Sequence, residues 1–131
     1  MKFAWSIADR VSGGRVRTRI ATSSAKIFLT FDDGPHPVHT VELLELLSSF
    51  DARCTFFLVG DNAERYPEIV RAIVARGHRI GNHSYAHPNW RTIPSARRRD
   101  EIARTDSILA SFDGHTTHEF RPPRGEIPLS V

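Results

Sequence analysis

Short apolar runs with β-favouring side chains alternate along this chain with stretches whose apolar residues recur at helical spacing. We expect strands over residues 26–31, 54–59, 79–82 and 119–121. We expect helices over residues 40–50, from Pro67 to just before Gly77, and over residues 95–112. Strands that alternate with helices form βαβ units with parallel strands and right-handed crossovers. The pattern therefore predicts an α/β fold that begins near residue 26, after a lead-in segment of residues 1–25.

Local signals refine the two shorter helices. Thr40 is a candidate N-cap for the first, and Pro67 suits the first turn of the second. Gly77 fits the left-handed position that often follows a helix end. The residues expected to face the core are the apolar ones at helical spacing: Val41, Leu43, Leu44, Leu46, Leu47, Ile69, Val70, Ile73 and Val74.

A polar cluster follows each predicted strand. These clusters are Asp32-Asp33, Asp61-Asn62, His83 to His87, and Arg121 to Gly125. In a parallel barrel the carboxyl ends of the strands meet on one face, so we expect the four clusters to converge there. Four units make only about half of such a barrel, which normally takes roughly 200 residues or more. The first or the fourth strand would then be a bare edge with an exposed apolar face.

The side chains at this expected meeting point suit a divalent metal. A zinc ion that activates water needs three protein ligands and one open position, and Asp33, His83 and His87 can supply the three. Asp32 can act as a base beside them. Taken singly, paired histidines in a loop are more often surface residues, and Asp-Asp-Gly-Pro is a common turn sequence. A cation would relieve the repulsion between the adjacent carboxylates, and His36 is the best further candidate for touching a ligand.

Composition limits the alternatives. The 131 residues carry a net charge of +3, which suits one ordinary globular domain. Cys54 is the only cysteine, so the chain can form no internal disulfide, and its apolar surroundings predict a buried thiol. The basic run 97–99 could favour an anionic partner, but helical spacing of apolar residues after it favours a solvated helix face. We expect no nucleic-acid partner, no membrane span and a cytoplasmic location, since the first residues lack a signal-peptide pattern.

Three motifs resemble those of the polysaccharide deacetylase family, also called the NodB homology domain. They are Thr-Phe-Asp-Asp-Gly-Pro-His at residues 30–36, His-Ser-Tyr-Ala-His-Pro at 83–88, and Arg-Pro-Pro-Arg-Gly at 121–125. The resemblance implies a deformed seven-stranded (β/α) barrel, here truncated after about four units, so residues 26–131 would be a partial domain. It also implies removal of acetyl groups, N- or O-linked, from an oligo- or polysaccharide, with zinc, cobalt or nickel as cofactor.

The resemblance assigns roles to single residues. Asp32 would be the catalytic base, Arg121 would hold its carboxylate, and Asp33, His83 and His87 would bind the metal. Pro123 and Arg124 would line the substrate groove, and the backbone N–H of Arg124 would help to stabilise the tetrahedral oxyanion. Position 124 is usually aromatic in the family, so the Arg124 side chain would change the groove wall.

The family's later motifs are not found in these 131 residues. They are an Asp-Trp segment and a Leu-x-His segment whose histidine protonates the leaving amine. Loss of a general acid removes roughly 10²–10⁴-fold of rate. Two alternatives to an autonomous deacetylase follow: a non-catalytic metal- or glycan-binding remnant, and a fragment that is stable only with a partner. The sugar, the linkage and the oligomeric state are left open by the sequence.

Overall fold

A computed structural model describes residues 25–126, so the predicted lead-in segment lies almost entirely outside the described residues. The helices and strands follow one another in the order β1 (Leu29–Gly34), α2 (His39–Ser49), β2 (Cys54–Leu58), α3 (Gly60–Arg65), α4 (Pro67–Ala75), β3 (Arg79–Asn82), α5 (Ser95–Asp113) and the short 3-10 helix η1 (Pro123–Gly125). The predicted elements at residues 54–59, 67–75, 79–82 and 95–112 are confirmed. The helix α3 was not predicted, because six polar and small residues give no helical period.

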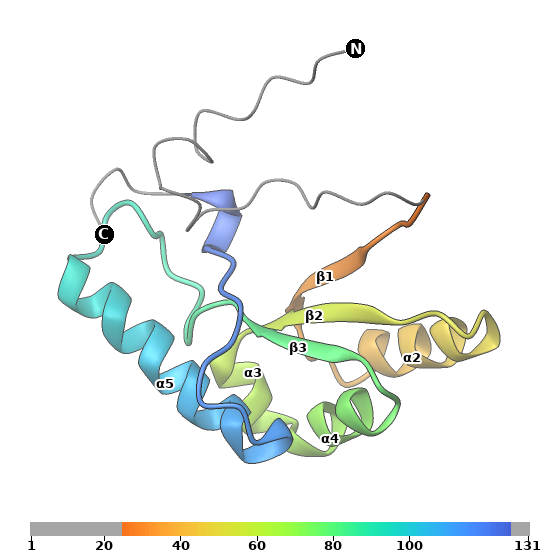
Figure 1. The fold of residues 1–131 in the computed structure, drawn as a ribbon. Helices are drawn as coiled ribbons and strands as arrows, with labels where there is room; N and C mark the ends of the chain where they lie inside the picture. Colours follow the sequence, from red (N-terminus) through yellow and green to blue (C-terminus); the bar gives the residue numbers. More distant parts are fainter. Residues whose placement is uncertain (1–24, 127–131) are drawn as a thin grey trace, which may run out of the picture.

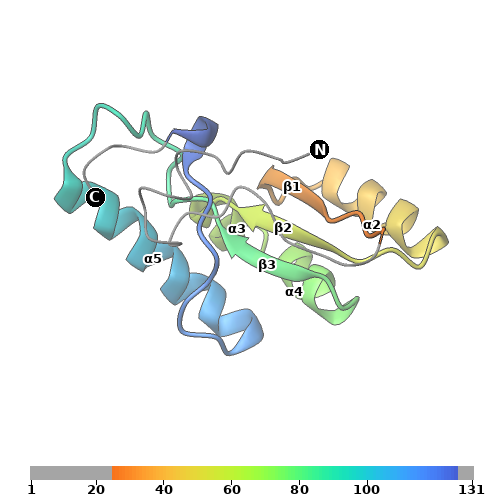
Figure 2. The ribbon, with the colours of Figure 1, turned by 45° about the horizontal axis from the view of Figure 1, so that its top comes forward.

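The strands form one parallel sheet in the order β1-β2-β3. Figure 1 shows α2, α3 and α4 along one face of this sheet, with α5 beside β3. Turning the molecule brings the other face forward, where the segment after α5 passes over the end of β3 (Figure 2). The predicted α/β class with parallel strands is therefore confirmed, whereas a closed barrel is not seen in the described residues.

The helical side of the sheet holds the hydrophobic core. Alternate residues of β2 point into it, namely Cys54, Phe56 and Leu58, because successive side chains of a strand face opposite sides. The apolar faces of α2, α4 and α5 pack against them through residues that are buried or nearly so: Leu44, Leu47, Ile69, Val70, Ile73 and Leu109. Gly77 has a φ of 78°, which confirms the predicted left-handed position after α4.

The start of α2 differs from the prediction. The helix begins at His39, and Thr40 lies buried inside its first turn instead of capping it. The Thr40 hydroxyl oxygen accepts a hydrogen bond from the backbone N–H of His36 at 2.8 Å. The Nδ1 atom of His36 accepts from the backbone N–H of His39 at 3.2 Å, so a histidine side chain satisfies the donor that a threonine was expected to satisfy.

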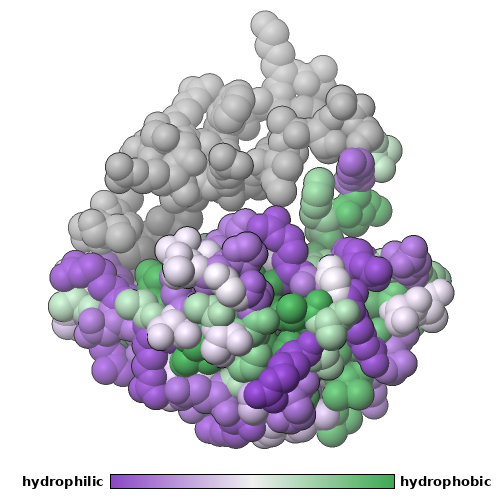
Figure 3. Space-filling view, turned by 60° about the horizontal axis from the view of Figure 1, so that its bottom comes forward, coloured by the Kyte–Doolittle hydropathy of each residue, from purple (hydrophilic) through white to green (hydrophobic). Residues whose placement is uncertain are grey.

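Part of the predicted apolar stripe of α2 faces away from the core. Leu44 and Leu47 are buried, but Val41 and Leu46 are exposed. Their neighbours on this side are the edge strand β1 and the segment before it, where Ile27 is 88% exposed. In the space-filling view of Figure 3 the segment that leads into β1 stands clear of the body and is hydrophobic. The expected bare edge is thus on the first strand.

The predicted fourth strand is reduced to a single bridge. Phe120 pairs with Asn82 in parallel, and no longer ladder follows. The backbone N–H of Asn82 donates to the carbonyl of Glu119, and the N–H of Arg121 donates back to the carbonyl of Asn82. Pro122 and Pro123 follow directly and offer no N–H, so the ladder cannot continue. None of the helices in residues 25–126 combines the length and apolar character that crossing a membrane requires.

Candidate functional site

A bulge in β1 places the two adjacent aspartates. Phe31 pairs with Phe56 and Gly34 with Leu58, so Asp32 and Asp33 together face one residue of β2. Asp33 has a φ of 69°, a left-handed conformation that aspartate tolerates better than most residues. The bulge interrupts the strict alternation of side chains, and it lets neighbouring carboxylates serve two different partners at the carboxyl end of the sheet.

The loop after β3 brings the two histidines together. Ser84 and His87 have positive φ values of 68° and 49°, which are unusual for residues other than glycine. The rings of His83 and His87 consequently lie with their centroids 5.1 Å apart. Strained backbone of this kind costs on the order of 1–3 kcal/mol per residue and concentrates at functional sites.

Asp33, His83 and His87 converge at one point. Oδ1 of Asp33 lies 3.3 Å from Nε2 of His83 and 3.2 Å from Nε2 of His87. Within the described residues these three form the one group of metal-binding side chains whose ligand atoms all lie within 4.8 Å of one another. Two imidazole nitrogens and one carboxylate are a donor set that suits zinc and related divalent ions, so the residues present fit such a metal.

The protonation of His83 is fixed by its other ring nitrogen. Nδ1 of His83 lies 2.7 Å from the carbonyl oxygen of Arg121. A carbonyl oxygen only accepts hydrogen bonds, so Nδ1 carries a proton and Nε2 is left with its lone pair toward Asp33 and His87. This is how ligating histidines are usually oriented.

Arg121 also contacts Asp32 through its side chain. Its Nη1 donates to Oδ1 of Asp32 at 2.6 Å and to the hydroxyl of Thr30 at 2.9 Å. The guanidinium carbon lies 4.0 Å from the centre of the Phe57 ring, so the side chain crosses the middle strand to reach β1. Thr30 was not predicted, although its spacing of two from Asp32 places both side chains on the same side of a strand.

Further contacts hold the loop and the bulge in place. The side chain of Asn62 donates to the carbonyl of Asp33 at 3.0 Å. The N–H of Ala86 donates to the buried carboxylate of Glu101 at 2.7 Å. The hydroxyl of Tyr85 donates to Glu64 at 2.8 Å, and this hydrogen bond raises the pKa of Tyr85 above its ordinary value. The loop between the two histidines is therefore anchored to α3 and α5.

An open hollow of about 370 Å³ adjoins the three converging residues. It is lined by Asp33, Val59, Asp61, Asn62, Ala86 and His87. A hollow of this size is large enough for a small ligand such as a sugar residue.

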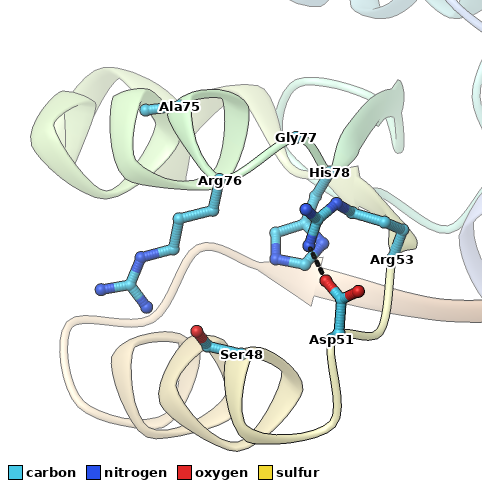
Figure 4. Close-up of a pocket in the computed structure, with 7 residues that line it drawn as sticks. All are labelled: Ser48, Asp51, Arg53, Ala75, Arg76, Gly77 and His78. Atoms are coloured by element: carbon cyan, nitrogen blue, oxygen red, sulfur yellow. Dashed lines mark ion pairs between the residues drawn. The ribbon is translucent and has the colours of Figure 1, made fainter.

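A second hollow, of about 360 Å³, lies at the opposite end of the sheet, where β2 and β3 begin (Figure 4). Arg53 and Arg76 line it with His78, and Arg53 pairs with Asp51. Burial, and then the nearby charges of Arg53 and Arg76, lower the pKa of His78. None of the predicted site residues lies there, so this hollow is separate from the candidate site.

The remaining predicted residues are placed differently. His36 is exposed, and its Nδ1 is engaged by backbone N–H groups at the start of α2. Pro123 is buried, and Arg124 is exposed with a φ of 58°. Arg121 and His83 link these residues to the converging group only through the chain, so substrate contact by His36, Pro123 and Arg124 stays a prediction.

Comparison with known proteins gives a consistent picture. A family model described as polysaccharide deacetylase matches residues 19–131. A peptidoglycan-N-acetylglucosamine deacetylase of Bacillus cereus is 43% identical over 105 residues, which are 80% of this chain and 38% of that protein. A chitooligosaccharide deacetylase of Azorhizobium caulinodans is 37% identical over 82% of this chain and 51% of that protein.

A solved structure agrees with these matches. A crystal structure of a peptidoglycan N-acetylglucosamine deacetylase aligns with a TM-score of 0.79 and 42% identity, and covers 82% of this chain and 50% of that one. The chain thus spans about half or less of the length of the relatives it matches.

Proposed function

Because this chain belongs to the polysaccharide deacetylase family, we propose that it forms the amino-terminal part of a metal-dependent hydrolase that removes acetyl groups from sugars. The bond broken would be the carbon–nitrogen bond of an N-acetyl group, or the ester bond of an O-acetyl group. The single observation that carries the proposal is the convergence of Asp33, His83 and His87 beside the Asp32–Arg121 pair.

The metal would be held by Oδ1 of Asp33 and by Nε2 of His83 and of His87. A divalent ion supplies Lewis-acid polarisation of the acyl carbonyl and lowers the pKa of water, with zinc the first candidate and cobalt or nickel the alternatives. The chain's own part is to present three donors at one point, and to keep Nε2 of His83 free of a proton through the carbonyl of Arg121.

Asp32 is the proposed base. Only one of its neighbours on the chain, Asp33, belongs to the converging group, so Asp32 keeps a carboxylate available for the proton of an attacking water. Arg121 neutralises Asp32 through the 2.6 Å contact and fixes its direction. The two adjacent aspartates would in this way carry separate tasks.

The proposed substrate class is an N-acetylated oligo- or polysaccharide. It is supported by the names of the relatives, which act on peptidoglycan and on chitooligosaccharides. The hollow of about 370 Å³ beside His87 is the proposed place for the acetylated sugar. The cytoplasmic location stays a prediction, and the oligomeric state stays open.

We also propose that the described sheet is part of the deformed barrel of this family. The relatives are about twice as long or longer, and β1 presents an open edge among the described residues. Those two observations favour an activity that needs more chain than these residues. They also keep the second candidate in view, a metal- or glycan-binding remnant without catalysis.

Acetate release from N-acetylglucosamine oligomers, with and without added Zn²⁺ or Co²⁺, tests the proposal. Asp32→Asn is the catalytic variant, and Asp100→Asn, an exposed residue of α5 with the same change of charge, is the matched control. Metal-dependent release that is lost in Asp32→Asn and kept in Asp100→Asn supports the proposed hydrolase. A chain that binds zinc but releases no acetate favours the remnant for these residues alone.

A further inference from the structure

His118 is a buried histidine between two carboxylates, at some distance from the proposed metal ligands along the chain. Its side chain is 2% exposed. Nδ1 lies 3.0 Å from Oδ1 of Asp106, and Nε2 lies 3.2 Å from Oδ1 of Asp113. Both aspartates belong to α5, whereas His118 lies on the segment that returns from α5 toward β3. The imidazole therefore ties this segment to the helix at two points.

The same Asp106 oxygen has a second partner. Oδ1 of Asp106 accepts a hydrogen bond from Nδ2 of Asn82 at 2.8 Å. Asn82 is fully buried, and its Oδ1 accepts from the N–H of Ser84 at 2.9 Å. One carboxylate oxygen thus connects the return segment, the end of β3 and the loop that carries the paired histidines.

The return segment leads directly to the proposed site. Through the bridge at Asn82, the N–H of Arg121 donates to the Asn82 carbonyl at 2.9 Å. The Arg121 carbonyl then orients His83, and the Arg121 side chain holds Asp32. An error in the position of Arg121 would consequently disturb a proposed metal ligand and the proposed base together.

We propose that His118 is a positioning residue: its contacts with Asp106 and Asp113 set the place of Arg121, and through Arg121 the orientation of His83 and Asp32. The inference rests on the proposed function only for the meaning of the site, because the contacts themselves lie outside it. Partners in the outer shell of a metal site typically change metal affinity by 10- to 100-fold when removed.

Two substitutions separate positioning from simple packing. The amide nitrogen of asparagine can take the place of Nδ1, so His118→Asn can keep the contact with Asp106. The amide nitrogen of glutamine can take the place of Nε2, so His118→Gln keeps the contact with Asp113 and loses the one shared with Asn82. Packing alone predicts the opposite ranking, since asparagine leaves the larger cavity.

The first measurement is Zn²⁺ affinity by competition with a chelating dye, with folding followed by circular dichroism. We expect affinity within about threefold of the wild-type chain for His118→Asn, and a loss of about tenfold for His118→Gln and for Asp106→Ala. Asp100→Ala, on the same helix, is the control for the charge change and should leave the affinity unaltered. If Asp106→Ala does not fold, the two His118 variants decide.

The second measurement is amide hydrogen exchange in the metal-free chain. We expect faster exchange at the N–H of Arg121 in His118→Gln than in His118→Asn, with the N–H of Phe56 in the β1–β2 ladder unchanged. Equal exchange at Arg121 in the wild type and both variants overturns the positioning role. A wild-type chain that binds no zinc contradicts the proposed metal site, and the exchange data then still decide the role of His118.

Discussion

Nη1 of Arg121 lies 2.6 Å from Oδ1 of Asp32, although 89 positions separate the two residues in the chain. The carbonyl oxygen of the same arginine lies 2.7 Å from Nδ1 of His83. One residue therefore contacts the proposed base with its side chain and a proposed metal ligand with its backbone. Because the two contacts use different atoms, mutation can remove the first and leave the second.

We expect Arg121→Ala to separate catalysis from metal binding. The backbone carbonyl that orients His83 remains, so Zn²⁺ affinity should change by less than about threefold. Acetate release should fall by roughly 100-fold, since a positioned base contributes on the order of 10²–10⁴ in rate. Arg121→Lys should restore little, because one ammonium cannot reproduce the planar set of donors that meets Asp32 and Thr30. Loss of zinc binding in Arg121→Ala would contradict this division.

Zinc should stabilise the folded chain, and His87→Ala should remove that effect. A ligand that binds only the folded state stabilises it by about 4 kcal/mol at a thousandfold excess over its dissociation constant. Thermal unfolding with and without Zn²⁺ measures the shift. His39→Ala is the matched control, because His39 is an exposed histidine that pairs with Glu42 outside the converging group. An equal zinc-induced shift in His87→Ala would show that the metal binds elsewhere.

Gly81→Ala should destabilise the sheet beneath Arg121. A Cβ atom at Gly81 would lie 2.7 Å from two ring atoms of Phe57 and 3.1 Å from the carbonyl oxygen of Glu119. Overpacking of this kind typically costs about 1–3 kcal/mol. Urea unfolding checks the loss, and adding Phe57→Leu to Gly81→Ala should recover part of it. An unchanged free energy of unfolding would mean that the backbone shifts freely at this position.

Cys54 should be unreactive while the chain is folded. Burial raises the pKa of the Cys54 thiol from 9.0 to about 11, so the nucleophilic thiolate is scarce at pH 8. Labelling with a disulfide reagent should be slow in buffer and fast in concentrated urea. Rapid labelling of the folded chain would show that the core opens around β2.

The same shift gives a pH dependence of stability. Between about pH 9 and pH 11 the folded state binds more protons at Cys54 than the unfolded state, so stability should fall as the pH rises. A shift of about two pKa units corresponds to at most about 3 kcal/mol. Cys54→Ala should show a flatter profile in this window when urea unfolding is measured across it, and an equally steep profile would assign the effect to another group.

The sequence by itself determined the order of elements and the residues of the candidate site. Strands and helices such as β3 and α4 follow from short-range periodicity, which needs no tertiary information. The convergence of Asp33 with His83 and His87 followed from their positions after successive parallel strands, since such ends meet at one edge of a sheet. Arg121 was placed beside Asp32 by family resemblance.

Only the tertiary structure decided how these residues meet. The bulge that divides Asp32 from Asp33, the capping of α2 by His36 and the clamp on His118 each depend on contacts between segments far apart or on strained backbone. The exposure of Val41 and Leu46 depends on what packs against α2, which helical spacing cannot show. Local patterns report which residues are apolar or charged, whereas the partner of each side chain is fixed by the packing of the whole sheet and its helices.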